Sequence, residues 1–248
     1  MNAEPILVLD DVVGGYGKMT ILNGTTARVH RAGITTVIGP NGAGKSTMFK
    51  AIFGLLPVRN GKIFFAGRDT TNLPPRKMLD AGLVYIPQGR NIFPELSVRH
   101  NLELGGTALT DQAQLSSRLD SVMQRFPVLR EKASAQASTL SGGQQKILEV
   151  ARGLLLEPKL ILIDEPSIGL SPIMVQEVFG ILKDLRGKGV TIVLIEQNAR
   201  QALQISDYGI VLEQGQTRIE DKAESILSDP RIAQLFLGGG LAPVEAAS

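Results

Sequence analysis

The segment from Gly39 to Thr47, with the sequence GPNGAGKST, restricts the possible folds more than any other feature of this chain. It matches the phosphate-loop pattern G-x-x-x-x-G-K-[ST]. Residues 34–38 before it are all β-branched and predict a buried strand, and the apolar spacing over residues 46–56 predicts one face of a helix. A strand, a glycine-rich turn and a helix in this order predict an α/β fold with a polyphosphate site at the turn.

Each part of this loop has an expected role. The glycines let the backbone curl so that its N–H groups face a phosphate, Lys45 would contact the β- and γ-phosphates, and the Ser46 hydroxyl would bind Mg²⁺. The alternative is a glycine-rich turn that binds nothing. The nucleotide-binding residues predicted in this segment are Gly39, Pro40, Asn41, Gly42, Ala43, Gly44, Lys45, Ser46 and Thr47.

Length and composition narrow the class of protein. The 248 residues allow one large domain or a core with an inserted subdomain, and a net charge of +2 gives no sign of nucleic-acid binding. The chain has no cysteine and two distant histidines, which argues against disulfides and against thiolate or histidine metal sites. No apolar run approaches the roughly 18 residues of a membrane span, and residues 1–10 lack the basic start of a signal peptide. Any membrane role would therefore come through a partner.

A second group of functional residues follows the apolar strand predicted at residues 160–163. Asp164 and Glu165 come at its C-terminal end, which is where ligands bind in parallel α/β sheets. Adjacent strand residues point in different directions, so the two acids need different roles. We expect Asp164 to share the Mg²⁺ shell with Ser46, and Glu165 to act as general base toward the attacking water. The alternative is a pair of solvated acids.

The segment Leu140–Gln144, with the sequence LSGGQ, stands directly before a predicted helix at residues 145–156 and is called the signature segment below. Ser141 is a good N-cap, and the two glycines open the backbone around the helix start, which makes a second anion site. The chain's own phosphate loop cannot fold over this site, so we expect the phosphate to come from a second ATPase domain. The alternative is a capped helix with no ligand.

The rest of the chain gives the order of the elements. Residues 89–156 predict a mostly helical insert, and the apolar runs around it predict strands buried on both faces. Tyr16 could stack its aromatic ring on an adenine, or it could be an ordinary tyrosine of a surface loop. Its distance in sequence from the phosphate loop fits both interpretations. Strands are predicted at residues 6–9, 63–66, 83–86, 190–195 and 209–212, helices at 111–126, 198–205 and 223–227, and a flexible tail at 238–248.

These motifs, in this order, resemble those of ATP-binding-cassette (ABC) nucleotide-binding domains over residues 4–237. The resemblance implies a RecA-like P-loop core with a mixed or parallel sheet, an N-terminal β-rich part and an inserted helical subdomain. It also implies a head-to-tail dimer with two ATP molecules, each between the phosphate loop of one domain and the signature segment of the other. The matching features are Tyr16, residues 39–47, Gln88, the signature residues Leu140, Ser141, Gly142, Gly143 and Gln144, and residues 160–165 and 167–171.

Finer features resemble one subfamily. Residues 87–98, 169–172 and 195–198 are similar to one of the two paired ATPase subunits of bacterial branched-chain amino acid importers, and amide and urea importers share these traits. The resemblance implies that Gln88 contacts Mg²⁺ and water and links the site to a membrane-spanning partner. It implies a second ATPase subunit or a second copy, permeases, an indirectly attached periplasmic binding protein, and a location on the cytoplasmic face of the bacterial inner membrane.

Two residues depart from the general family pattern. Gln197 stands where the family has a histidine that contacts the γ-phosphate, and an amide can donate a hydrogen bond but cannot carry a proton. Ser171 replaces an aspartate. Both changes fit a subunit that pairs with a different subunit, and they put full hydrolysis by a homodimer in doubt.

The sequence therefore predicts an ATP-hydrolysing, energy-coupling subunit of an importer, with Glu165, Gln88 and Gln197 at the reaction centre. Ser46, Gln88 and Asp164 are the predicted Mg²⁺ ligands, and Tyr16 is the predicted adenine contact. The alternatives are urea or amide import, export by the same machinery, and a soluble ATPase acting on DNA or ribosomes.

Overall fold

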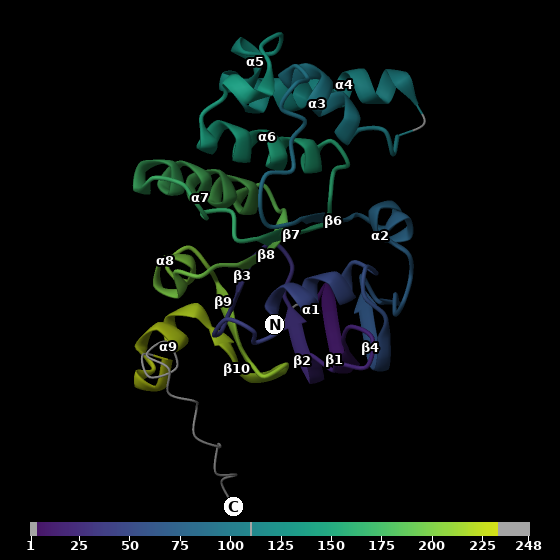
Figure 1. Cartoon of the computed structure of the whole chain (residues 1–248), viewed down its shortest axis with the longest axis vertical. Helices are drawn as coiled ribbons and strands as arrows, with labels where there is room; N and C mark the ends of the chain where they lie inside the picture. Colours follow the sequence, from purple (N-terminus) through teal and green to yellow (C-terminus); the bar gives the residue numbers. More distant parts are fainter. Residues whose placement is uncertain (1–3, 110, 233–248) are drawn as a thin grey trace, which may run out of the picture. The chain divides into compact units, whose positions relative to one another are not determined.

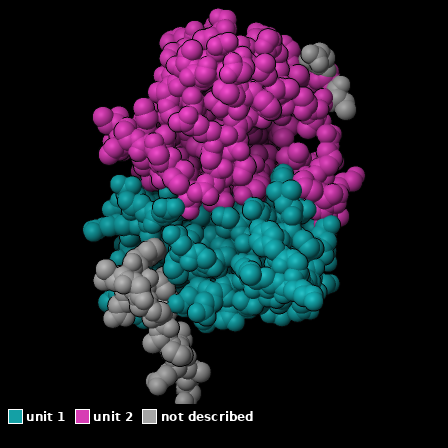
Figure 2. All heavy atoms as spheres, in the orientation of Figure 1, with its two compact units in different colours: residues 1–72, 194–248 teal, residues 73–193 magenta. Residues whose placement is uncertain are grey.

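The computed structural model describes residues 4–109 and 111–232, and the chain forms two compact units (Figures 1 and 2). Unit 1 combines residues 1–72 with residues 194–248, and unit 2 holds residues 73–193. The flexible tail predicted at residues 238–248 lies outside the described residues.

Unit 1 is built around two groups of strands. An antiparallel sheet has the order β2-β1-β4-β5, and a second group has the order β10-β9-β3, in which β9 is parallel to β3 and antiparallel to β10. The strands are β1 (Leu7–Gly14), β2 (Leu22–Val29), β3 (Ile34–Ile38), β4 (Val58–Phe65), β5 (Arg68–Asp69), β9 (Tyr208–Glu213) and β10 (Gln216–Lys222). The helices of unit 1 are α1 (Lys45–Ile52), α8 (Ala199–Leu203) and α9 (Ala223–Ser228).

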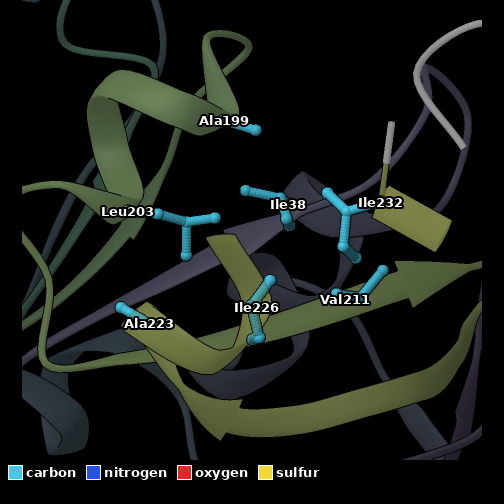
Figure 3. Close-up of a cluster of buried hydrophobic side chains, with 7 residues drawn as sticks. All are labelled: Ile38, Ala199, Leu203, Val211, Ala223, Ile226 and Ile232. Carbon is cyan, nitrogen blue, oxygen red and sulfur yellow. The ribbon is translucent and has the colours of Figure 1, made fainter. Parts of the chain in front are cut away.

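A buried cluster fixes the central strands of unit 1 against helices α8 and α9. Every residue of β3 is buried, as its continuous apolar and threonine sequence predicts. Figure 3 shows the side chains of this cluster, which come from β3, β9, the two helices and the segment that follows α9. Burying one such isoleucine or leucine contributes ~1.5–3 kcal/mol. The members of the cluster are Ile38, Ala199, Leu203, Val211, Ala223, Ile226 and Ile232.

Unit 2 contains a parallel strand pair and a set of helices. Strands β6 (Leu83–Ile86) and β7 (Leu160–Asp164) pair in parallel, and β8 (Thr191–Ile195) contains the point where the chain passes back to unit 1. The chain between β6 and β7 contains helices α3, α4, α5 and α6. These helices lie together in Figure 1. The helices of unit 2 are α2 (Pro75–Ala81), α3 (Val98–Gly105), α4 (Gln112–Arg125), α5 (Pro127–Glu131), the short 3-10 helix η1 (Ala137–Thr139), α6 (Gly142–Leu154) and α7 (Pro172–Gly187).

The sequence located the strands that are buried on both faces closely, whereas partly exposed strands were predicted only in part or missed. The predictions at residues 6–9 and 63–66 cover only parts of β1 and β4, whose burial alternates. The strands predicted at residues 34–38, 83–86, 160–163 and 190–195 are confirmed by β3, β6, β7 and β8. Strand β10 was not predicted, because its sequence QTRIEDK is mostly exposed and polar. Strand β2 and helix α7 were also missed. Within the described residues, no helix is long and apolar enough to cross a membrane.

Candidate functional site

The phosphate loop connects β3 to α1 in unit 1, and its backbone requires glycine. Gly39 has a φ of 152°, and a Cβ there would lie 2.0 Å from the carbonyl oxygen of Leu212 on β9. Gly44 caps α1 with a φ of 101°, in the left-handed region. The loop therefore turns sharply between β9 and the start of α1, where the helix directs its first N–H groups outward.

Lys45 is held inside this loop. Its side chain is buried, and its Nζ donates hydrogen bonds to the carbonyl oxygens of Gly39, at 2.8 Å, and Pro40, at 3.1 Å. Ser46 and Thr47 follow in the first turn of α1 and are half-buried. The loop thus presents an ammonium group and helix-start amides together, which is the chemistry that binds a polyphosphate.

Tyr16 lies beside the same helix. Lys50 on α1 donates a hydrogen bond to the Tyr16 hydroxyl at 3.3 Å, and its Nζ is 5.7 Å from the ring centroid. The tyrosine is 47% exposed, so its ring is accessible for stacking. The structure therefore brings Tyr16 to the helix that follows the phosphate loop.

Gln197 belongs to unit 1 and follows β8. It is exposed, and the next residue, Asn198, caps α8 by accepting a hydrogen bond from the backbone N–H of Gln201. This cap fixes the start of α8 directly after Gln197.

In unit 2, the two predicted acids lie at the C-terminal end of β7. Asp164 is 2% exposed and Glu165 is 7% exposed, so neither is a solvated surface acid. Tyr85 donates a hydrogen bond to Oδ2 of Asp164 at 3.3 Å, and Gln88 Nε2 donates to Oε2 of Glu165 at 2.8 Å. Because β6 and β7 are parallel, their C-terminal ends lie side by side and bring these four residues together.

The signature segment forms the capped start of α6. Ser141 Oγ accepts from the backbone N–H of Gln144 at 3.3 Å, and the Gln144 side chain accepts from the backbone N–H of Ser141 at 3.2 Å, which together make a capping box. Lys132 also donates to Gln144 Oε1, at 3.0 Å. The N-cap role predicted for Ser141 is confirmed.

The two signature glycines allow close packing against residues 167–174. A Cβ at Gly142 would lie 3.2 Å from Cδ2 of Leu170, and a Cβ at Gly143 would lie 3.1 Å from the Met174 side chain on α7. Ser171 is the N-cap residue of α7 but makes no side-chain capping bond. Helix α7 and the segment before it are therefore packed directly against the start of α6.

The structure groups the predicted site residues by unit. Tyr16, the phosphate loop and Gln197 lie in unit 1, and Gln88, Asp164, Glu165 and the signature segment lie in unit 2. Tyr85 and Lys132 were not predicted from the sequence. Tyr85 could have been found from its place in a predicted strand next to β7, but nothing in the sequence links Lys132 to Gln144.

The predicted metal ligands fit a hard divalent cation. Ser46, Gln88 and Asp164 offer a hydroxyl, an amide oxygen and a carboxylate, and Mg²⁺ prefers oxygen ligands of these kinds. The buried position of Asp164, with one oxygen bound by the Tyr85 hydroxyl, holds this carboxylate in a fixed orientation. Among the described residues, no group of three or more histidine, cysteine or acidic side chains could hold a metal ion.

Comparisons with known proteins agree with this geometry. The sequence profile of the ABC transporter family matches residues 22–168. The chain is 39% identical over 234 residues to the high-affinity branched-chain amino acid transport ATP-binding protein BraG of Pseudomonas aeruginosa, a match that covers 94% of this chain and 100% of that protein. It is 30% identical to the lipopolysaccharide export system ATP-binding protein LptB of Acidithiobacillus ferridurans, over 94% of this chain and 97% of that protein.

The fold is also that of solved ATP-binding cassettes. The crystal structure of the ADP conformation of MJ1267, an ATP-binding cassette of an ABC transporter, matches with a TM-score of 0.85 and 28% identity, over 95% of this chain and 100% of that one. The predicted α/β P-loop fold and the predicted resemblance to branched-chain amino acid transport ATPases are confirmed. By its phosphate loop, its sequence and its fold, the chain belongs to the ABC transporter family.

Proposed function

We propose that this chain is the ATP-hydrolysing, energy-coupling subunit of an importer for branched-chain amino acids. The observation that carries the catalytic part is the 2.8 Å hydrogen bond from Gln88 to Glu165 at the end of β7. This bond holds a buried carboxylate at the strand edge where α/β proteins bind their ligands. The similarity to BraG supports the cargo class.

The proposed chemistry is in-line attack of water on the γ-phosphate of ATP. Glu165 accepts the proton of the attacking water, and Gln88 orients Glu165 and that water. Lys45 and the amides of the phosphate loop bind the phosphates, and Tyr16 stacks on the adenine. Mg²⁺, held by oxygen atoms of Ser46, Gln88 and Asp164, would neutralise charge on the phosphates.

The proposed assembly contains two ATPase subunits. The signature residues Ser141, Gly142, Gly143 and Gln144 would bind the phosphate held by the partner's loop, so that ATP closes the dimer and hydrolysis reopens it. Gln197 cannot carry a proton, which favours pairing with a second, histidine-bearing ATPase subunit. Closure would move membrane permeases that receive amino acids from a periplasmic binding protein, with this chain on the cytoplasmic face of the inner membrane.

Export is the second candidate, because the chain is also similar to LptB over nearly its whole length. Reconstitution into liposomes with its permeases, a second ATPase subunit and the periplasmic binding protein separates the two functions. We expect ATP-dependent uptake of leucine, no uptake of urea, and no activity with a Lys45→Met variant. Extraction of lipid without leucine uptake would support export and overturn the import proposal.

A further inference from the structure

Helix α6 carries two charged residues on a buried face. Lys146 and Glu149 are 6% and 4% exposed, and they form a salt bridge of 2.5 Å. Apolar side chains at these positions would usually serve stability as well or better, because burying an ion pair removes two charges from water. The pair therefore calls for a role other than packing.

Both charges bind the main chain of the segment that follows Gln88. Lys146 Nζ donates to the carbonyl oxygen of Gly89 at 3.0 Å, and Glu149 Oε1 accepts from the backbone N–H of Asn91 at 2.6 Å. The polarity of each contact is fixed, because a carbonyl needs a donor and an N–H needs an acceptor. Positions 146 and 149 are one helical turn apart, so the two contacts come from the same face of α6.

The side chains of Arg152 and Asn91 also hold the same segment. Arg152, one turn further along this face, donates a hydrogen bond to the carbonyl oxygen of Asn91 and lies 5.4 Å over the ring of Phe93. Burial lowers the pKa of Arg152 and the Glu149 carboxylate opposes this shift. Asn91 Nδ2 closes the turn by donating to the carbonyl oxygen of Pro87 at 2.8 Å. The main chain is thus held on both sides of Gln88.

We propose that Lys146 and Glu149 are positioning residues that fix Gln88 against Glu165 by binding the main chain at Gly89 and Asn91. This inference rests on the proposed function, in which Glu165 is the general base. Ser141 is the N-cap of helix α6, so the same helix that starts with the signature segment also sets the position of Gln88. Gln88 is exposed and would otherwise sample other orientations.

The first test uses the Lys146→Met, Glu149→Leu double variant, which removes both partners of the salt bridge together. Arg152 loses the neighbouring carboxylate but keeps its hydrogen bond to the Asn91 carbonyl. We expect hydrogen exchange at the Asn91 amide to rise at least tenfold in the isolated chain, with thermal unfolding and nucleotide affinity little changed. In the reconstituted transporter, kcat should fall at least tenfold while KM stays within about twofold. The control is Arg99→Gln, Glu103→Gln, which removes an exposed ion pair of α3 and should change neither quantity.

The second test reverses the pair in a Lys146→Glu, Glu149→Lys variant. The salt bridge can re-form, but a carboxylate then faces the Gly89 carbonyl and an ammonium faces the Asn91 N–H. We expect the same loss of kcat, whereas full activity would mean that the ion pair only stabilises α6 and would overturn the proposal. Glu149→Asp, which keeps the charge and shortens its reach, gives the same test if the double variants fold poorly, and unchanged kcat there also contradicts the proposal.

The readouts separate this proposal from the proposed function. A wild-type assembly that does not hydrolyse ATP would overturn the proposed function. An active wild type whose double variant is equally active, or whose Asn91 amide exchange is unchanged, would overturn the positioning role alone.

Discussion

Glu165 has a backbone conformation that few glutamates adopt. Its φ is 49°, its carboxylate is buried, and its Oε2 accepts the hydrogen bond of Gln88. A left-handed backbone at a non-glycine residue costs of order 1–3 kcal/mol and persists where the surrounding structure enforces it. The site therefore holds this carboxylate in place at the expense of local strain.

Replacing Glu165 by glutamine tests the general-base role. The amide keeps the size of the side chain but cannot accept a proton, so we expect ATP binding to remain and turnover in the assembled transporter to fall by about 10²–10⁴-fold. ATP binding is measured by titration with a fluorescent nucleotide, and turnover by phosphate release. Glu103→Gln, at an exposed position on α3, is the control. Normal turnover of the Glu165 variant would show that another group removes the proton.

Tyr16 offers a test with a matched control. Removing the ring by Tyr16→Ala should raise the ATP concentration required for half-saturation by about five- to tenfold, because one aromatic stacking contact contributes ~1 kcal/mol. Tyr16→Phe keeps the ring and removes only the hydroxyl bonded to Lys50, so it should bind ATP as the wild type does. Equal affinity of the alanine variant would mean that Tyr16 is an ordinary surface residue.

Helix α6 combines two functions at its first turn. Ser141 caps the helix, and the same N–H groups form the expected phosphate site. The sequence predicted the cap and the apolar positions of this helix, because both depend on local pattern. It did not predict that Lys146 and Glu149 are buried, because their partners Gly89 and Asn91 lie more than 50 residues away in the sequence.

A Ser141→Asp variant separates these two functions. Aspartate caps helices as well as serine does, and its charge suits the helix start, so we expect stability within about 0.5 kcal/mol of the wild type. The same charge would repel a phosphate, so ATPase activity of the assembly should fall at least tenfold. Thermal unfolding and phosphate release measure the two effects. Retained activity would reduce Ser141 to a structural cap.

At the scale of the whole chain, the sequence predicted which elements exist better than how they pair. The buried strand β3 could be identified from its run of β-branched residues, and β7 from its continuous apolar run. Their neighbours could not, because β3 pairs with β9 far along the chain, and strand order depends on contacts that no local pattern records. The phosphate-loop lysine itself was predictable from the motif, but its hydrogen bonds to the carbonyl oxygens of Gly39 and Pro40 were not predicted. Tyr85 beside Asp164 required the parallel pairing of β6 and β7.

The stability of the chain should depend on pH through Glu220 on β10. Burial raises the pKa of this carboxyl above its ordinary value of 4.5, although the bond from the Arg28 N–H and the charges of Arg28 and His30 act in the other direction. A carboxyl whose pKa is raised in the folded protein stabilises the fold fully at pH values below its unfolded-state pKa. This stabilisation is lost as the pH rises through the folded-state pKa. The free energy of unfolding of the Glu220→Gln variant, relative to that of the wild type, should therefore increase from pH 4 to pH 7.

The expected gain is less than about 1 kcal/mol, because the side chain is partly solvated. Urea unfolding at both pH values measures it, and the glutamine can still accept from the Arg28 N–H. A variant that loses stability at neutral pH relative to the wild type would contradict this assignment.

The pairing of Thr35 with Tyr208 also bears on how the protein is made. A ribosome adds about 5–20 residues per second, so the strand before the phosphate loop emerges roughly 10–35 seconds before its parallel neighbour exists. During that interval strand β3, which is buried along its whole length in the folded chain, lacks its neighbour β9. Slower translation of the 172 residues between Thr35 and Tyr208 (208 − 35 − 1) would lengthen the period in which this strand depends on chaperones to avoid aggregation.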